Sequence, residues 1–364
     1  IGYHYYLPPA WTNVGEGFYG VTTMAVGTNG VLYAGGQFTN AGSVVANSIA
    51  QWHGTSWSAM GGGMPYGEFN RWGVKAVVVS PNGIVYAGGP FTNTAAHSGA
   101  NYIAQWNGTN WAKVGSGISD VAWTLAAATN GDLYASGWFA TAGGVTVNYI
   151  GKWNGSSWSA LGSGFTAYDQ YAQALATGPN GVLYAAGPFT TVGGVAANRI
   201  AKWNGSSWSA LGSGIEGSVV SALAVAPNGD LYAGGIFTTA GGVEVNNIAR
   251  WNGSSWSAVG DGLNGFVNAL TVDTNGVLYA GGTFTNSGGV GVSRMAKWNG
   301  ASWSGLDSGL NASCSALACA PNGDVFAAGG FSMAGGVAAA GIAGWSRAYY
   351  ETDGVDPDSG SWEG

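Results

Sequence analysis

Apolar and polar residues alternate along most of this chain with the period of a β-strand. In residues 219–260 four short runs of such alternation follow one another; Asn228-Gly229 joins the first two and Asn252-Gly253 the last two. An Asn-Gly pair between alternating runs is typical of a tight hairpin, because a type I′ turn needs a positive φ at both central residues. The pattern therefore predicts two hairpins in series, which form an antiparallel sheet of four short strands.

This four-strand unit recurs seven times along the chain. The first turn of each copy begins at an Asn that returns every 47 to 53 residues: Asn29, Asn82, Asn130, Asn180, Asn228, Asn275 and Asn322. Nine positions after each of them stands a phenylalanine: Phe38, Phe91, Phe139, Phe189, Phe237, Phe284 and Phe331. Four-stranded sheets that repeat every ~40–50 residues are typical of a β-propeller, in which the sheets are blades around an axis. We therefore predict an all-β fold, a seven-bladed β-propeller of four-stranded antiparallel blades.

Two tryptophans mark the outer half of each unit. The third strand ends in the first of them: Trp52, Trp106, Trp153, Trp203, Trp251, Trp298 and Trp345. The fourth strand begins with the second: Trp57, Trp111, Trp158, Trp208, Trp256 and Trp303. The last unit lacks this second tryptophan, but the segment that starts at Trp11 matches the one that starts at Trp208. We therefore expect the N-terminal strand to close the ring, with the propeller over residues 1–346 and an acidic, Pro- and Gly-containing tail or linker over 347–364.

The first strand of each unit places a large apolar residue next to a small one. The large residues are Met24, Val77, Leu125, Leu175, Leu223, Leu270 and Leu317. The residues before them are Thr23, Ala76, Thr124, Ala174, Ala222, Ala269 and Ala316. Large side chains facing small ones let neighbouring twisted sheets interdigitate at native density. We therefore expect the blades to pack through these positions, and most Trp and Phe side chains to belong to the core.

The two cysteines, Cys314 and Cys319, lie five positions apart in one apolar run. In a strand this spacing puts them on opposite faces and roughly 16 Å apart, too far for a disulfide. A redox or metal pair is one interpretation. However, both align with valines of another copy, Val220 and Val225, which favours two small buried apolar residues.

The repeat also resembles a known family. The apolar strand that ends in Gly-Gly at Leu231–Gly235, followed by an aromatic strand and a Trp-led strand, resembles the kelch repeat of galactose-oxidase-like propellers over almost the whole chain. It differs in that Trp251 precedes Trp256 by five positions, where kelch repeats usually have Tyr and Trp about six apart. It is most similar to Gly/Trp-rich repeats of secreted or surface-attached bacterial proteins. The resemblance implies the architecture. It does not imply a particular activity, because propellers host many unrelated activities.

Composition excludes two classes of function. Charged residues make up 7% of the 364 residues and the net charge is −7, whereas nucleic-acid binding calls for a basic patch. No apolar run approaches the ~20 residues that cross a membrane, so membrane insertion is not expected. Low charge with many aromatic residues fits a rigid extracellular or cell-surface protein.

Candidate binding residues lie where copies depart from the repeat. Both Asn-Gly turns of a blade lie on one edge of the ring, the short-turn rim; the connections from strand two to three and from strand four to the next blade lie on the other, the long-loop rim. Function is often carried by such loops. The departures on this rim are Tyr66, Glu68, Arg71, Trp72, Trp123, Trp138, Tyr168, Asp169 and Tyr171. Aromatic faces beside carboxylates and amides suit carbohydrate; packing of long loops is the alternative interpretation.

No catalytic or cofactor motif is present in a supporting context. The three histidines, His4, His53 and His97, are scattered, and nothing matches the copper centre of galactose oxidase. A carboxylate pair such as Glu68 with Asp169 is of the residue type that acid–base work needs, but the sequence does not give their separation in space. We therefore predict a protein that is not an enzyme and has no cofactor. In the tail, a calcium loop is an alternative to a linker, and its ligands would be Asp353, Asp356 and Asp358.

A column of polar residues precedes the third-strand tryptophan. It reads Gln51, Gln105, Lys152, Lys202, Arg250, Lys297 and Gly344. We expect it to face solvent; a ring of cations toward a polyanion is the alternative.

Three functions follow in order of preference. The first is a non-enzymatic extracellular or cell-surface scaffold that contacts a protein partner or assembles with itself. The second is lectin-like glycan binding through the long-loop rim. The third is a polysaccharide lyase or hydrolase.

Overall fold

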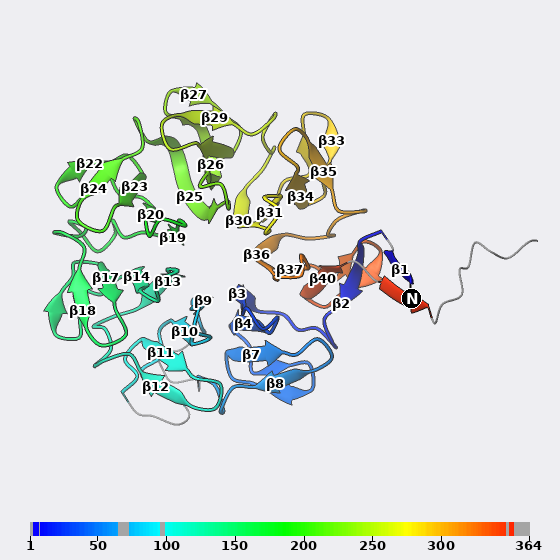
Figure 1. The fold of residues 1–364 in the computed structure, drawn as a ribbon, viewed down its shortest axis with the longest axis horizontal. Coiled ribbons are helices and arrows are strands. Elements are labelled where there is room, and N and C mark those ends of the chain that lie inside the picture. The colour runs from blue at the N-terminus through cyan, green and yellow to red at the C-terminus, as the bar shows by residue number, and fades with distance from the viewer. Residues whose placement is uncertain (1–2, 7, 65–72, 95–98, 347–348, 353–364) are drawn as a thin grey trace, which may run out of the picture.

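Seven four-stranded antiparallel sheets are arranged as blades around a central axis (Figure 1). The computed structural model describes residues 3–6, 8–64, 73–94, 99–346 and 349–352. All regular elements within these ranges are strands. The predicted seven-bladed β-propeller is confirmed.

The blades follow one another in chain order, and each runs outward from the axis. Blade 1 consists of β3 (Val21–Val26), β4 (Leu32–Gly36), β7 (Ile49–Trp52) and β8 (Trp57–Ala59), and blade 2 of β9 (Ala76–Val79), β10 (Val85–Gly88), β11 (Ile103–Trp106) and β12 (Trp111–Lys113). Blade 3 consists of β13 (Ala122–Ala127), β14 (Leu133–Gly137), β17 (Ile150–Trp153) and β18 (Trp158–Ala160), and blade 4 of β19 (Ala174–Thr177), β20 (Leu183–Ala186), β23 (Ile200–Trp203) and β24 (Trp208–Ala210). Blade 5 consists of β25 (Ile215–Val225), β26 (Leu231–Ala240), β28 (Ile248–Trp251) and β29 (Trp256–Ala258). Blade 6 consists of β30 (Val267–Val272), β31 (Leu278–Gly282), β34 (Met295–Trp298) and β35 (Trp303–Gly305).

Blade 7 combines the two ends of the chain. Its inner strands are β36 (Cys314–Cys319), β37 (Val325–Gly329) and β40 (Ile342–Ser346), and its outermost strand is β2 (Ala10–Asn13). β2 runs antiparallel to β40, with Trp11 opposite Trp345. The N-terminal strand therefore supplies the tryptophan that the last unit lacks, as the sequence predicted.

Small hairpins in the connection from strand two to strand three were not predicted. They are β5 (Asn40–Ala41) with β6 (Val44–Val45), β15 (Thr141–Ala142) with β16 (Val145–Thr146), β21 (Thr191–Val192) with β22 (Val195–Ala196), β32 (Asn286–Ser287) with β33 (Val290–Gly291), and β38 (Met333–Ala334) with β39 (Val337–Ala338). In blade 5 the second strand is long enough to pair directly with β27 (Val243–Glu244). These hairpins lie on the long-loop rim, because they belong to the connection between strands two and three.

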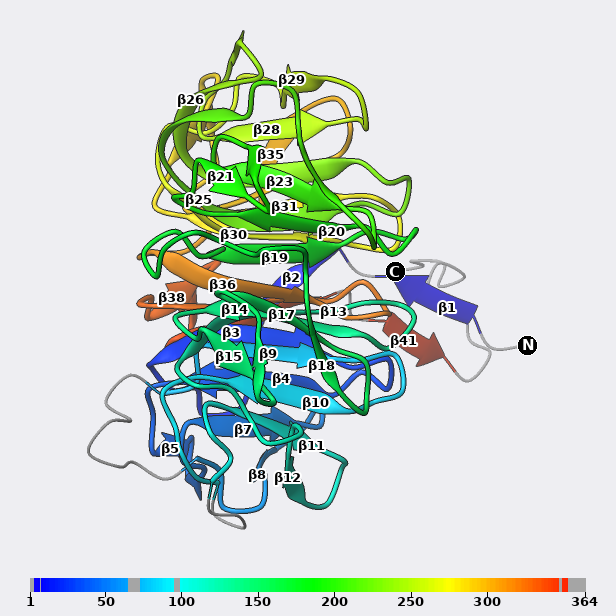
Figure 2. The ribbon, with the colours of Figure 1, turned by 90° about the vertical axis from the view of Figure 1, so that its left-hand side faces the viewer.

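A further strand pair lies beside blade 7, outside the ring (Figures 1 and 2). β1 (Tyr3–Tyr6) pairs with β41 (Tyr349–Thr352), so part of the segment expected to be a tail is a strand. The expected domain boundary at residue 346 stays a prediction. No helix among the described residues is long and apolar enough to span a membrane.

Apolar residues pack between the blades as the alternation predicted. Leu125 shares a buried apolar cluster with Ala76 of the preceding blade, and Leu317 shares another with Ala269. All seven phenylalanines of the repeat are buried. Cys314 is buried and Cys319 is half-buried; both are free thiols, which confirms that they form no disulfide.

The outer tryptophans join neighbouring blades by hydrogen bonds. Each indole Nε1 donates to the carbonyl oxygen of the residue that follows the outermost strand of the preceding blade. The pairs are Trp11 with Leu306, Trp57 with Val14, Trp111 with Met60, Trp158 with Val114, Trp208 with Leu161, Trp256 with Leu211 and Trp303 with Val259. These bonds complete the circle, because Trp11 belongs to blade 7 and Val14 follows the same strand.

Candidate aromatic binding site on the long-loop rim

Four of the nine predicted binding residues, and all three candidate calcium ligands, lie outside the described residues. This holds for the enlarged connection between blades 1 and 2, with Tyr66, Glu68, Arg71 and Trp72, and for the candidate calcium ligands Asp353, Asp356 and Asp358. The proposed carboxylate pair of Glu68 with Asp169 therefore stays a prediction. The remaining candidates are Trp123, Trp138, Tyr168, Asp169 and Tyr171.

Three of these five residues form one aromatic cluster. Trp123 lies in β13, Trp138 follows β14, and Tyr171 precedes β19, so the cluster joins blades 3 and 4. The ring centroids of Trp123 and Trp138 are 5.0 Å apart in an edge-to-face arrangement. Tyr171 lies 6.4 Å from each of them, nearly parallel to Trp123 and perpendicular to Trp138. All three side chains are half-buried, so they offer aromatic surface to solvent and keep a fixed geometry.

A fourth residue joins the cluster from blade 2. The Lys75 Nζ atom lies 5.3 Å from the centroid of the Trp123 ring, a cation–π distance. Burial lowers the pKa of the Lys75 ammonium, which is the expected effect of removing a cation from water. The cluster therefore spans three consecutive blades and includes one basic group.

Polar groups hold the tyrosine in place. Burial raises the pKa of the Tyr171 phenol, and hydrogen bonds with the side chains of Gln173 and Trp138 act in the opposite direction. The phenol is therefore neutral at physiological pH, and its orientation is fixed by two neighbours. An aromatic surface with an amide and a hydroxyl beside it can stack on a ligand and hydrogen-bond to it.

Lys75 and Gln173, which the sequence prediction did not include, occupy the position seven residues before the turn Asn of their blades. That position reads Thr22, Lys75, Trp123, Gln173, Ser221, Asn268 and Ser315. In blades 1, 5 and 6 this side chain donates to a carbonyl oxygen of the next blade: Thr22 to Val74, Ser221 to Val267 and Asn268 to Cys314. Blades 2, 3 and 4 replace these short polar side chains with long ones. The long side chains at this repeat position in blades 2, 3 and 4 are therefore a feature of the sequence that indicates the site.

The cluster borders the central channel. The inner strands of the blades line a cavity of about 190 Å³, which includes Thr124 and Gln173 beside the cluster and Thr22 and Ser221 on other blades. Thr124 is the neighbour of Trp123 in β13. A ligand on the cluster would therefore lie at the mouth of the channel.

Tyr168 and Asp169 do not join the cluster. The Tyr168 side chain is 66% exposed and makes no ring contact with another described residue. Asp169 is exposed as well. Both lie on the same connection as Tyr171, two or three positions before it in the chain.

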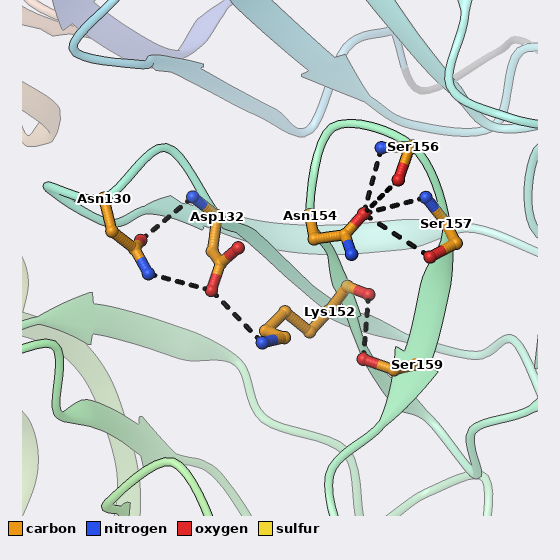
Figure 3. A network of polar contacts seen from close by, with 7 residues as sticks. All are labelled: Asn130, Asp132, Lys152, Asn154, Ser156, Ser157 and Ser159. Atoms are coloured by element: carbon orange, nitrogen blue, oxygen red, sulfur yellow. Dashed lines mark hydrogen bonds and ion pairs between the residues drawn. The ribbon is translucent and has the colours of Figure 1, made fainter.

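The cations of the polar column are partly neutralised. Lys152 Nζ lies 3.2 Å from Asp132 Oδ2, and Arg250 Nε lies 2.8 Å from Asp230 Oδ2. Figure 3 shows the first pair between the two Asn-Gly turns of blade 3. These pairs argue against a continuous ring of free cations toward a polyanion. No group of three or more His, Cys, Asp or Glu suited to a metal ion occurs among the described residues.

Comparison with known proteins supports the fold. No family model and no curated protein sequence matches the chain. Among solved structures, streptogramin B lyase matches with 13% identity and a TM-score of 0.58, over 95% of this chain and 98% of that one. The WD40 repeats of RRP9 match with 11% identity and a TM-score of 0.59, over 94% and 100%. The extracellular domain of a putative one component system of B. thetaiotaomicron matches with 11% identity and a TM-score of 0.56, over 92% of this chain and 39% of that one.

These likenesses define a class of protein. The chain is a seven-bladed β-propeller, and its structural neighbours include WD40 propellers. At such low identity the likeness concerns the fold alone. The resemblance to kelch repeats of surface proteins stays a prediction.

Proposed function

We propose that this chain is a non-enzymatic extracellular or cell-surface module, a rigid scaffold that binds a protein partner or a second copy of itself through the long-loop rim. The observation that carries the proposal is the partly exposed aromatic cluster of Trp123, Trp138 and Tyr171 with Lys75, which spans three blades. Binding hot spots are enriched in aromatic and basic residues that lie near the centre of an interface.

Structural neighbours give supporting context. They include the WD40 propeller of Doa1 and a chain of the mitotic checkpoint complex. A ring in which every blade is hydrogen-bonded to the next is a rigid platform, which lowers the entropic cost of binding. The scarcity of charge supports an extracellular setting.

Site-specific photo-crosslinking tests the proposal. A photoreactive side chain at the exposed position of Tyr168 reports on the long-loop rim, and one at Ser206 reports on the short-turn rim of blade 4. With surface extract of the source cells, we expect a defined crosslinked product from position 168 and not from 206. Trp138→Ala should weaken it at least tenfold. Equal products from both positions, or no product from either, would contradict the proposal.

Carbohydrate is the second candidate ligand of the same surface. It is favoured by the partly exposed rings of Trp123 and Trp138 beside the Gln173 amide, because sugar CH groups stack on aromatic faces while amides take the hydroxyls. A glycan array followed by calorimetry tests it. Binding that is lost in Trp138→Ala would support it, and silence across broad panels would count against it.

A further inference from the structure

A groove on the opposite, short-turn rim lies between blades 5 and 6. Its volume is about 330 Å³, and it is bordered by Asn228, Asp230, Tyr232, Arg250, Asn275 and Trp298. The first four residues belong to blade 5 and the last two to blade 6. The groove is therefore an inter-blade feature, on the other side of the ring from the aromatic cluster.

Arg250 forms an ion pair with Asp230 in this groove, but its Nε–H makes no well-aligned hydrogen bond to a described residue. Its Nε atom lies 2.8 Å from Asp230 Oδ2, yet no acceptor among the described residues is aligned with the Nε–H. The attraction is therefore coulombic, without a well-directed hydrogen bond. Asp230 is itself 8% exposed and accepts a 2.9 Å hydrogen bond from Asn228 Nδ2. The Arg250 side chain is 43% exposed, which leaves its terminal Nη groups as the reachable donors.

The groove also carries an aromatic wall. In six blades the third-strand tryptophan is buried, with exposures of 4% to 8%. Trp298 is the exception: it is partly exposed. Tyr232 belongs to the buried cluster against which Trp298 packs, and burial raises the pKa of its phenol, so the hydroxyl stays protonated at neutral pH.

We propose that this groove binds a carboxylate attached to an apolar or aromatic group, with the carboxylate on the Arg250 guanidinium and the apolar part against Trp298. A guanidinium presents parallel N–H donors that match a carboxylate, whereas an ammonium is a point charge. Arg250 is the one arginine of its column, in which blades 3, 4 and 6 carry lysine. Asp230 orients the arginine and leaves donors for the ligand. The site goes beyond the proposed function and does not depend on it.

Titration with matched small molecules tests the proposal. The probe is 3-phenylpropionate, and its uncharged control is 3-phenylpropanamide. The readout is the indole N–H resonance of Trp298 in an NMR spectrum, assigned by its loss in Trp298→Phe. We expect saturable shifts of this resonance with the acid and none with the amide. Equal shifts with both would overturn the proposal, because they would show apolar contact without carboxylate recognition.

Variants separate the guanidinium from general charge. Arg250→Gln places in blade 5 the residue that blades 1 and 2 carry, and it should raise Kd at least tenfold. Arg250→Lys keeps the charge and should still raise Kd severalfold. The matched control is Lys202→Gln, the same position in blade 4, which should leave Kd unchanged. Unchanged binding in Arg250→Gln, or an equal loss in Lys202→Gln, would overturn the proposal; unchanged thermal unfolding confirms that each variant is folded.

A third probe identifies the source of the carboxylate. It is a short peptide that ends in Phe with a free carboxylate, compared with the same peptide amidated at its end. Tighter binding of the free peptide than of 3-phenylpropionate indicates a protein C-terminus as the ligand; equal binding indicates a small aryl acid. Both results support the site, whereas equal affinity of the free and the amidated peptide contradicts it.

Discussion

The indole Nε1 of Trp208 in blade 4 donates a 2.8 Å hydrogen bond to the carbonyl oxygen of Leu161 in blade 3, and both residues are buried. Since the same bond recurs at every blade interface, the blades are held together by a repeated polar contact as well as by apolar packing. A buried carbonyl that loses its donor is costly, so each of these seven bonds stabilises the position of one blade edge against its neighbour.

Trp208→Phe removes this donor and keeps an aromatic ring. The Leu161 carbonyl is then buried without its partner, and we expect the free energy of unfolding to fall by about 1–3 kcal/mol. Urea unfolding followed by circular dichroism measures the change. The control is Tyr168→Phe on the exposed connection, which should alter stability by less than about 0.5 kcal/mol. An equally small effect of both substitutions would show that the bond does not contribute.

Two adjacent glycines in the small hairpin of blade 4 share a left-handed backbone but differ in the space around them. Gly193 and Gly194 both have a positive φ, +59° and +77°. A Cβ at Gly193 would collide with the Trp208 ring, whereas one at Gly194 would meet open space. Gly194→Ala should therefore cost the backbone penalty alone, about 1–2 kcal/mol. Gly193→Ala should cost clearly more, because the buried indole must also move. Equal losses in thermal unfolding would contradict this order.

The fold was predictable because its signals are local. Alternation with period two and Asn-Gly turns define each hairpin within a few residues, and the missing tryptophan after Trp345 points to Trp11. The small hairpins escaped prediction because strands of two residues leave no alternation to read. Their trace in the sequence is a glycine at the turn, in most copies a Gly-Gly pair such as Gly193-Gly194; a Cβ at Gly193 would collide with the Trp208 ring.

The candidate site was predictable only in part. Trp123, Trp138 and Tyr171 stand out as departures from the repeat, and the structure brings them together. That Tyr168 remains apart depends on how its connection is routed, which no pattern encodes. Lys75 reaches Trp123 from another blade; this contact depends on the ring geometry, although its position in the repeat could have indicated it.

The ion pair between Lys152 and Asp132 is a weak contributor to stability. The 3.2 Å contact lies at the surface of blade 3 (Figure 3), where water and salt screen the attraction. We expect a coupling energy of about 0.2–1 kcal/mol in a double-mutant cycle of Asp132→Asn with Lys152→Gln. The coupling should shrink in high salt. A coupling that salt does not change would indicate a buried interaction.

The thiols of Cys314 and Cys319 should be unreactive in the native protein. Burial raises the pKa of Cys314 from 9.0 to about 12. Burial first, and the carboxylates of Asp273 and Asp324 second, raise the pKa of Cys319 to about 11. Since the thiolate is the reactive form, iodoacetamide at pH 8 should label neither residue until urea is added. Rapid labelling of the native protein would contradict the burial of these groups.

The same shifts make stability depend on alkaline pH. Above pH 9 the unfolded chain releases the Cys314 proton while the folded chain keeps it, so the folded state binds more protons and loses stability as pH rises. The stabilising contribution is fully present below pH 9 and is lost between pH 9 and about 12. For this buried thiol the slope is about 1.4 kcal/mol per pH unit; half-buried Cys319 should contribute less. Replacing both by valine, the residue of blade 5 at Val220 and Val225, should flatten urea unfolding midpoints between pH 8.5 and 10. An unchanged slope would assign the alkaline loss to the buried tyrosines instead.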